Sequence, residues 1–192
     1  MSKKILVIDG NPNPTSFGAS IASSYVAGAQ ERGAKIKRID IRSLQFDPNL
    51  PQGYDSLPQL EPDLQEAIDS MLWCEHMVWV HPIWWQGLPA LMKGFIDRTF
   101  LPDVTFKYVK GPIPKKLLAG RTGHIIATAD TPGWYQWLLN GNAPLKQLRR
   151  GTLQFCGVTP VRSTYIAPIR KSSLEFREKW LQRVAGFGEQ IV

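Results

Sequence analysis

The sequence has few cysteines and histidines and no long apolar run. Among its 192 residues are 2 Cys and 3 His. Two cysteines exclude a small disulfide-held scaffold, and because Cys74 and Cys156 form no Cys-x-x-Cys motif we expect both to be buried and reduced. The histidines show no spacing for a metal site; we expect His76 to be exposed and His124 to be a hydrogen-bonded core residue. The spacing of the cysteines and histidines therefore predicts no metal site. No apolar stretch approaches the roughly 20 residues that span a bilayer, so we expect no membrane insertion.

The composition is that of one folded domain with a basic surface. Hydrophobic residues make up 43% of the chain, which excludes disorder and fits a single domain over residues 1–192. Lys and Arg outnumber Asp and Glu by 23 to 16, for a net charge of +7. The basic residues are dispersed, and the largest cluster is Lys146, Arg149 and Arg150. Because no nucleic-acid-binding motif is present, we expect a phosphorylated small molecule as the ligand.

The N-terminus leads almost at once into a strand. Residues 1–4 are polar apart from the initial Met, and residues 5–8 form a short apolar run. A signal peptide needs a longer apolar stretch and a small-residue cleavage site. We therefore expect a cytoplasmic protein.

Strand and helix patterns alternate along the chain. We expect strands over 4–9, 35–41, 75–81, 121–129 and 158–167, and helices over 17–32, 61–73, 88–100, 144–155 and 172–187. Residues 43–60, 101–120 and 130–141 are expected to be irregular loops. This alternation predicts a three-layer α/β/α sandwich around a five-stranded parallel sheet, in the flavodoxin-like order 2-1-3-4-5. Such sheets bind ligands beyond the carboxyl ends of their strands.

The loop after the first expected strand suits a phosphate group. It runs from Asp9 to Gly18 and leads directly into a helix for which Ser16 is a good N-cap. The first turn of a helix offers free N–H groups and the positive end of the helix dipole, and Ser and Thr add hydroxyl donors. The loop is neither a Walker loop nor a Gly-x-Gly-x-x-Gly fingerprint, and a plain helix cap is the alternative interpretation.

Two adjacent tryptophans follow the third expected strand. Residues 81–89 read HPIWWQGLP, and the proline and glycine residues around the tryptophans disfavour a helix through Gln86. A rigid aromatic loop at the edge of a sheet can form a wall for a planar ligand, and its backbone amides can bond the polar rim of that ligand. This segment is therefore the most informative of the sequence.

Residues 81–100, HPIWWQGLPALMKGFIDRTF, resemble the signature of the NAD(P)H:quinone oxidoreductase (DT-diaphorase) family of flavoproteins. Ser16-Phe17 matches the family's phosphate loop, and the order of segments is similar over most of residues 4–165. The resemblance implies transfer of a hydride or two electrons from NAD(P)H, through bound FMN or FAD, to a quinone or similar flat acceptor. It also implies a homodimer, and the length of the chain favours FMN over FAD.

The resemblance implies three groups of site residues. The first would hold the flavin phosphate: Asn11, Thr15, Ser16, Phe17 and Gly18. The second would contact the isoalloxazine ring: Pro82, Ile83, Trp84, Trp85, Gln86, Thr128, Ala129, Asp130 and Trp134. The third would line the substrate pocket, partly from the neighbouring subunit: Phe106, Tyr108, Trp134 and Tyr135. Of these, Tyr108 and Tyr135 are the candidate catalytic residues that would bond the acceptor oxygen, with a plain packing role as the alternative.

The sequence departs from the family pattern at two places. Asn11 stands where the family often has His, and Thr128-Ala129-Asp130 stands where the family has a Thr-Gly-Gly turn. A carboxylate at Asp130, beside the electron-rich edge of a flavin, would disfavour negative charge on the reduced ring. Asp97 matches an acidic position near the flavin in the family, but we favour an ion pair between Asp97 and Arg98 or a contact within the helix.

Two other functions share this fold and stay open. One is an electron-carrier flavodoxin, although such carriers are usually acidic and this chain has a net charge of +7. The other is a flavin-binding regulatory subunit of a potassium-efflux transporter, a role that some relatives of the family have. A phospho-receiver domain is excluded because the third strand ends in His81, where a receiver needs an aspartate.

Overall fold

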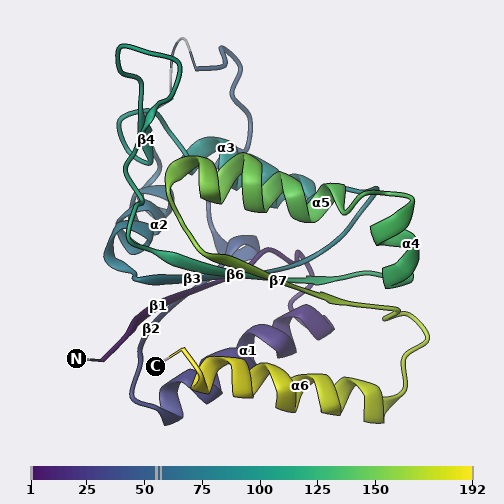
Figure 1. Ribbon diagram of the computed structural model, residues 1–192. Helices are drawn as coiled ribbons and strands as arrows, with labels where there is room; N and C mark the ends of the chain where they lie inside the picture. The colour runs from purple at the N-terminus through teal and green to yellow at the C-terminus, as the bar shows by residue number, and fades with distance from the viewer. Residues whose placement is uncertain (1, 55, 57, 192) are drawn as a thin grey trace.

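Five parallel strands form the central sheet, in the order β2-β1-β3-β6-β7 (Figure 1). The computed structural model describes residues 2–54, 56 and 58–191. The strands of the sheet are β1 (Lys4–Asp9), β2 (Lys35–Asp40), β3 (His76–Pro82), β6 (Thr122–Thr128) and β7 (Val161–Ile166). Counted along the chain, these are the five expected strands in the expected order 2-1-3-4-5, so the predicted fold is confirmed.

Helices cover both faces of the sheet. In Figure 1, α1 (Phe17–Glu31) and α6 (Leu174–Glu189) lie below the sheet, whereas α2 (Pro62–Trp73), α3 (Ala90–Thr99) and α5 (Ala143–Lys146) lie above it. Two glycines let α1 and α6 pack with their backbones in contact. A β-carbon on Gly28 would collide with the carbonyl oxygen of Ala185, and one on Gly188 would collide with that of Tyr25. The predicted three-layer sandwich follows from this arrangement.

The core lies in two layers, one on each side of the sheet. Successive side chains of a strand point to opposite faces, so Leu6 and Ile8 join the layer under α2 and α3, whereas Ile5 and Val7 join the layer against α1 and α6. All four side chains are fully buried. The apolar run at residues 4–9 is therefore explained by burial of β1 on both faces.

Two of the three expected loops contain regular structure. Residues 101–120 hold a small antiparallel hairpin of β4 (Phe106–Lys107) and β5 (Lys115–Lys116), whose strands are too short to produce an alternating pattern. Residues 130–141 hold the helix α4 (Gly133–Leu138), which begins after Pro132. Only one side chain of α4 is buried, so the helix has no apolar face from which its period could be recognised.

The other differences are smaller. The 3-10 helix η1 (Ile41–Ser43) directly follows β2. The helix expected over 144–155 begins at α5 and continues as a π-helix, η2 (Gln147–Gln154). The expected element positions are otherwise confirmed to within about three residues at each end.

The environments of Asp97 and His76 differ from the prediction in different degrees. Asp97 makes the helix contact that was one of its two expected forms, since its carboxylate lies 2.6 Å from Lys93 Nζ on the same helix. The other form is wrong, because Arg98 Nη2 lies 2.7 Å from Glu61 Oε2. Adjacent helix residues point in different directions, whereas residues four apart share a face. His76 is buried rather than exposed, with Nδ1 2.6 Å from Thr122 Oγ1. The first residue of β3 is thus already inside the sheet.

The two cysteines and His124 lie in the core, as expected. Cys74 and Cys156 are buried free thiols, and burial raises the pKa of Cys74 to about 12. His124 lies in the core and bonds Thr164 Oγ1 at 2.8 Å. Within the described residues, no helix is long and apolar enough to cross a membrane. Over the same part of the chain, no group of three or more His, Cys, Asp or Glu side chains could hold a metal ion.

Candidate functional site

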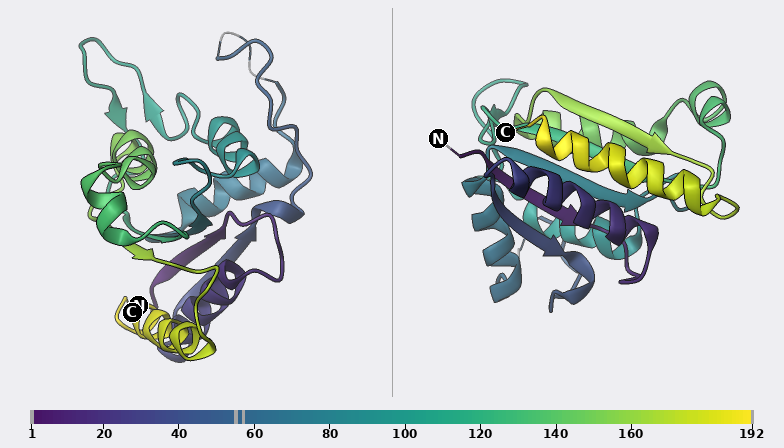
Figure 2. Two further views of the ribbon diagram at one scale, coloured as in Figure 1. Left: turned by 90° about the vertical axis from the view of Figure 1, so that its right-hand side faces the viewer. Right: turned by 90° about the horizontal axis from the view of Figure 1, so that it is seen from below.

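The loops after β1, β3, β6 and β7 meet at the carboxyl edge of the sheet, the end on which α4 stands (Figures 1 and 2). They enclose two adjoining cavities of about 200 and 540 Å³, which share Ile83, Trp84, Ala129 and Asp130 and which we call the groove. The cavity nearer α1 is also lined by Asn11, Ser16, Phe17, Gly18, Pro82, Thr128 and Ile169. The cavity farther from α1 is also lined by Trp85, Gln86, Thr131 and Arg170. Twelve of the predicted site residues thus line one continuous groove.

The loop after β1 is shaped by its own side chains. Asn13 N donates to Asn11 Oδ1 at 3.0 Å, and Thr15 N donates to Asn13 Oδ1 at 2.9 Å. Ser16 Oγ accepts from Ala19 N at 3.1 Å and caps α1 as predicted. Ser16 still has its hydroxyl proton to donate, and the first helical N–H groups have no acceptor within the helix. This end of the groove is therefore ready for an anion before a ligand arrives.

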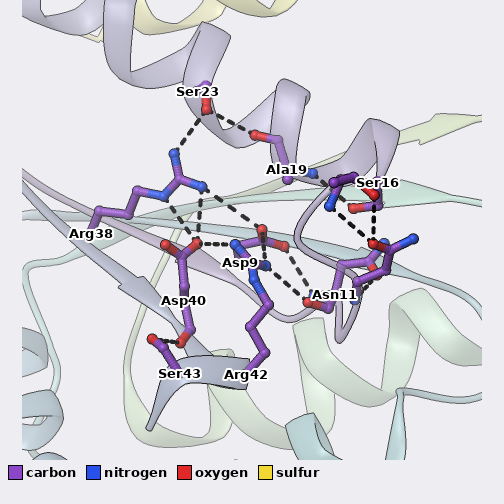
Figure 3. Close-up of polar contacts among 11 residues, drawn as sticks. Asp9, Asn11, Ser16, Ala19, Ser23, Arg38, Asp40, Arg42 and Ser43 are labelled. Carbon is purple, nitrogen blue, oxygen red and sulfur yellow. Dashed lines mark hydrogen bonds and ion pairs between the residues drawn. The ribbon is translucent and has the colours of Figure 1, made fainter.

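A buried ion pair fixes this loop to the sheet (Figure 3). The carboxylate of Asp9, at the end of β1, is fully buried. Arg42, on η1, donates from Nη1 to Asp9 Oδ2 at 2.6 Å and to the carbonyl oxygen of Asn11 at 3.0 Å. Arg42 Nη2 also lies 3.0 Å from Asp40 Oδ1. The sequence pattern did not identify this pair, because Arg42 lies 33 positions from Asp9.

The two tryptophans lie on a strained two-residue turn. Trp84 N donates to Gly87 O at 3.1 Å and Gly87 N donates to Trp84 O at 2.9 Å, which closes a small hairpin. Both central residues have positive φ, 49° at Trp85 and 57° at Gln86. Such turns favour Asn and Gly, and a bulky side chain in this conformation costs about 1–2 kcal/mol. The turn holds the Trp85 side chain fully exposed at the mouth of the groove, and strain of this kind is concentrated at functional sites.

A buried amide connects this turn to α4. Gln136 is fully buried, and its Nε2 donates to Gln86 Oε1 at 2.9 Å. Its neighbours on α4, Trp134 and Tyr135, are exposed and line neither cavity of the groove. The structure therefore places these two predicted residues beside the groove rather than in its wall. Sequence reasoning missed Gln136 because a glutamine in an aromatic loop carries no distinctive pattern.

The charge of Asp130 is paired. Arg170 donates its backbone N–H to Asp130 Oδ1 at 2.7 Å, and its Nε lies 3.3 Å from Asp130 Oδ2. The carboxylate at this edge of the groove is thus accompanied by a guanidinium, which opposes the electrostatic penalty expected for Asp130 alone. Arg170 and Ile169 follow β7, and their only signal in the sequence is that position, since the carboxyl ends of all five strands share one edge.

Three other predicted residues lie outside the groove of this chain. Thr15 Oγ1 bonds Asn13 Oδ1 at 2.9 Å and lines neither cavity. Phe106 is on the β4 hairpin, where its ring is 5.3 Å from that of Tyr108, and it lines a separate apolar cavity of about 340 Å³. Tyr108 is exposed. A role for Phe106 and Tyr108 at a groove therefore requires a second copy of the chain.

His81, at the end of β3, is neutral and fully buried. Its Nδ1 donates to the carbonyl oxygen of Pro82 at 3.0 Å. Burial lowers the pKa of His81 to about 4. The imidazole is therefore uncharged at neutral pH and cannot act there as a general acid.

A doubly wound parallel sheet, with an anion-ready loop after its first strand and an aromatic groove at its carboxyl edge, defines the flavodoxin-like class of proteins. A family model described as "Flavodoxin-like fold" matches residues 3–186. The chain belongs to this family, which confirms the resemblance inferred from residues 81–100.

Individual relatives agree with this assignment. The chain is 30% identical over 162 residues to an "Uncharacterized NAD(P)H oxidoreductase" of Haemophilus influenzae, covering 81% of this chain and 79% of the relative. It is 23% identical to the "Ribosyldihydronicotinamide dehydrogenase [quinone]" of Mus musculus, covering 95% and 90%. The crystal structure of Smu.1420 from Streptococcus mutans UA159 superposes with a TM-score of 0.80 at 30% identity, covering 97% and 99%.

Proposed function

We propose that this protein is a flavin-dependent NAD(P)H oxidoreductase that passes a hydride or two electrons to a quinone or similar flat acceptor. The observation that carries the proposal is the meeting of an anion-ready helix start and a strained aromatic turn in one groove. The names of the Haemophilus and mouse relatives support the reaction class and the quinone.

The residues of the groove fit a flavin phosphate at the end nearer α1. Asn11 Oδ1 is occupied by the N–H of Asn13, which leaves Nδ2 as a donor. Asn11 Nδ2 lies 3.1 Å from the place where a β-carbon on Gly18 would stand. An amide donor, the Ser16 hydroxyl and the first N–H groups of α1 therefore converge at one point, as recognition of a phosphate requires.

The rest of the groove fits a flat ring. A flavin held in this groove would supply the hydride chemistry between a nicotinamide and an acceptor. The chain has only to position the reactants, because stacking of two rings at about 3–3.5 Å needs no strong acid or base. Trp84 and Trp85 supply aromatic walls, and Ile83 is fixed by a bond of 2.8 Å from its N–H to Thr128 O.

The phosphate assignment is tested by a pair of serine caps. Ser16 caps α1 and Ser173 caps α6 with the same 3.1 Å bond. Aspartate caps a helix as well as serine does, so S16D and S173D should both fold with normal stability. In S16D the added charge faces the flavin phosphate, and we expect the Kd for FMN to rise at least about tenfold, which is a loss of roughly 1.4 kcal/mol. S173D should bind FMN as the unchanged protein does.

Riboflavin, which lacks the phosphate, is the ligand control. The affinity for riboflavin should be equal in S16D and S173D, because neither substitution lies in the part of the groove that would hold the flavin ring. Normal FMN affinity in S16D would overturn the placement of the phosphate at α1.

We also propose that the flavin is FMN, that the protein is a cytoplasmic homodimer, and that residues 1–192 act as one domain. The dimer is supported by the exposed side chains of Tyr108, Val109 and Ile113 on the β4–β5 hairpin. Phe155, which is also exposed, lines the apolar cavity that Phe106 of this hairpin borders. Sizing with light scattering tests the dimer, and mass spectrometry of the flavin released on denaturation tests FMN against FAD.

A further inference from the structure

A further cavity, of about 490 Å³, lies beside β7 and is strongly basic. It is lined by Gly133, Trp137, Asn142, Leu145, Lys146, Arg149, Arg150, Ser163 and Tyr165. No carboxylate is among these residues. Lys146, Arg149 and Arg150 form no ion pair with any described residue. A concave site with three cations and no carboxylate attracts an anion.

The helix that carries these cations breaks two local rules. Lys146 lies three and four positions before Arg149 and Arg150, a spacing at which like charges repel. Arg149 and Arg150 also lie in the π-helix η2, a conformation that is rare and frequent at functional sites. Both features cost stability in the free protein, and a bound anion would relieve the repulsion.

The cavity is next to the groove. Thr131 lines the groove and Gly133 lines the basic cavity, so a single residue, Pro132, separates them along the chain. Tyr165, in the wall of the basic cavity, donates its hydroxyl proton to Thr131 O at 2.6 Å. A long ligand with one end in the groove could therefore have its other end in the basic cavity.

We propose that the basic cavity binds the phosphate-bearing adenosine half of NADPH and so makes the enzyme prefer NADPH to NADH. This inference rests on the proposed function, because the nicotinamide half would occupy the groove. NADPH differs from NADH by a 2′-phosphate on the adenosine ribose, and Arg149 and Arg150 are suited to bond it at two oxygens. Trp137, also in the wall, offers an exposed ring on which an adenine can stack.

The kinetic test compares the two dinucleotides in R149Q, R150Q and the double variant. We expect kcat/KM for NADPH to fall about tenfold for each arginine, the effect of losing a hydrogen bond to a charged group, and kcat/KM for NADH to stay within about twofold. R32Q is the matched control, because Arg32 is an exposed arginine at the end of α1 and its loss lowers the net charge equally. Equal losses with both dinucleotides, or none with either, would overturn the proposal.

A binding test does not depend on catalysis. Adenosine 2′,5′-bisphosphate should bind to the unchanged protein and to R32Q, and its Kd should rise about tenfold in R149Q. If the bisphosphate binds in this way while neither dinucleotide is oxidised, the adenosine site stands and the proposed function fails. If R149Q binds the bisphosphate normally, or if inorganic phosphate displaces it at equal concentration, the cavity is no nucleotide site.

Discussion

The turn that presents Trp85 should lower the free energy of unfolding of the protein and raise its affinity for flavin. Trp85 adopts a φ of 49° while its side chain is fully exposed, so it pays a conformational cost without gaining burial. Replacing it by Gly removes a left-handed strain of about 1–2 kcal/mol. The same change adds about 0.5–1 kcal/mol of backbone entropy to the unfolded state. The difference predicts that the ligand-free W85G variant is about 0.5–1 kcal/mol more stable than W85A, which keeps the strain.

Both variants lack the indole ring and should lose flavin affinity alike. If stacking on Trp85 contributes about 1–2 kcal/mol, as it does for nucleobases on aromatic side chains, the Kd rises about 5–30-fold. Comparison of W85A with W85G therefore separates the strain of the turn from the contact with the flavin ring. Both variants lack that contact, and only the strain differs between them.

The assay is thermal unfolding of the ligand-free variants, with urea unfolding for the free energy, followed by titration of each variant with FMN. A chain of this size gains about 2–4 °C in Tm per kcal/mol, so W85G should melt about 1–4 °C above W85A. A W85G variant less stable than W85A would refute the strained turn. Unchanged flavin affinity in both variants would refute the position of Trp85 at the ring.

Two further predictions concern stability. R42A removes the 2.6 Å partner of the buried Asp9 carboxylate and leaves Arg38, 3.9 Å away, as its remaining guanidinium. The loss in urea unfolding should therefore be about 2 kcal/mol, below the cost of a wholly unpaired buried charge, and a loss below about 0.5 kcal/mol would contradict the anchoring of the loop after β1. His76, His81 and His124 have pKa values lowered by burial to about 3, 4 and 4, so the unfolded chain binds protons that the folded chain does not. Stability should therefore fall between pH 6.5 and 4, by up to about 1.4 kcal/mol per pH unit for each histidine, and equal stability at pH 7 and 5 would contradict their burial.

The fold was predictable because the signal for each buried element is local. The apolar run of β1 follows directly from burial on both faces of the sheet. In β2, Ile36 and Ile39 pack on opposite faces, and the polar residues around them mark a strand at the sheet edge. The helix α4 was not predictable, because its Trp and Leu side chains point into solvent and its one buried residue, Gln136, is polar. A helical period appears in a sequence only where one face of the helix contacts a core, and α4 makes little contact of that kind.

The site was predictable only in part, for a related reason. The loops that carry Ser16 and Trp84 follow the carboxyl ends of strands whose order was inferred, and the family resemblance added Asp130, so all three could be assigned to one site. Partners supplied by other segments carry no such signal. Arg42 for Asp9 and Arg170 for Asp130 lie more than 30 positions from the groups they neutralise, and only the folded chain shows the pairs.

The measurement that tests the account most directly is an absorption spectrum of the purified protein, taken without oxygen before and after addition of NADPH. We predict the bands of an oxidised flavin at the start, their loss on addition of NADPH, and their return when a quinone is added. Flavin bands that persist in the presence of both NADPH and NADH would contradict the proposed oxidoreductase. A protein that stays colourless after incubation with FMN and with FAD would contradict the flavin site itself.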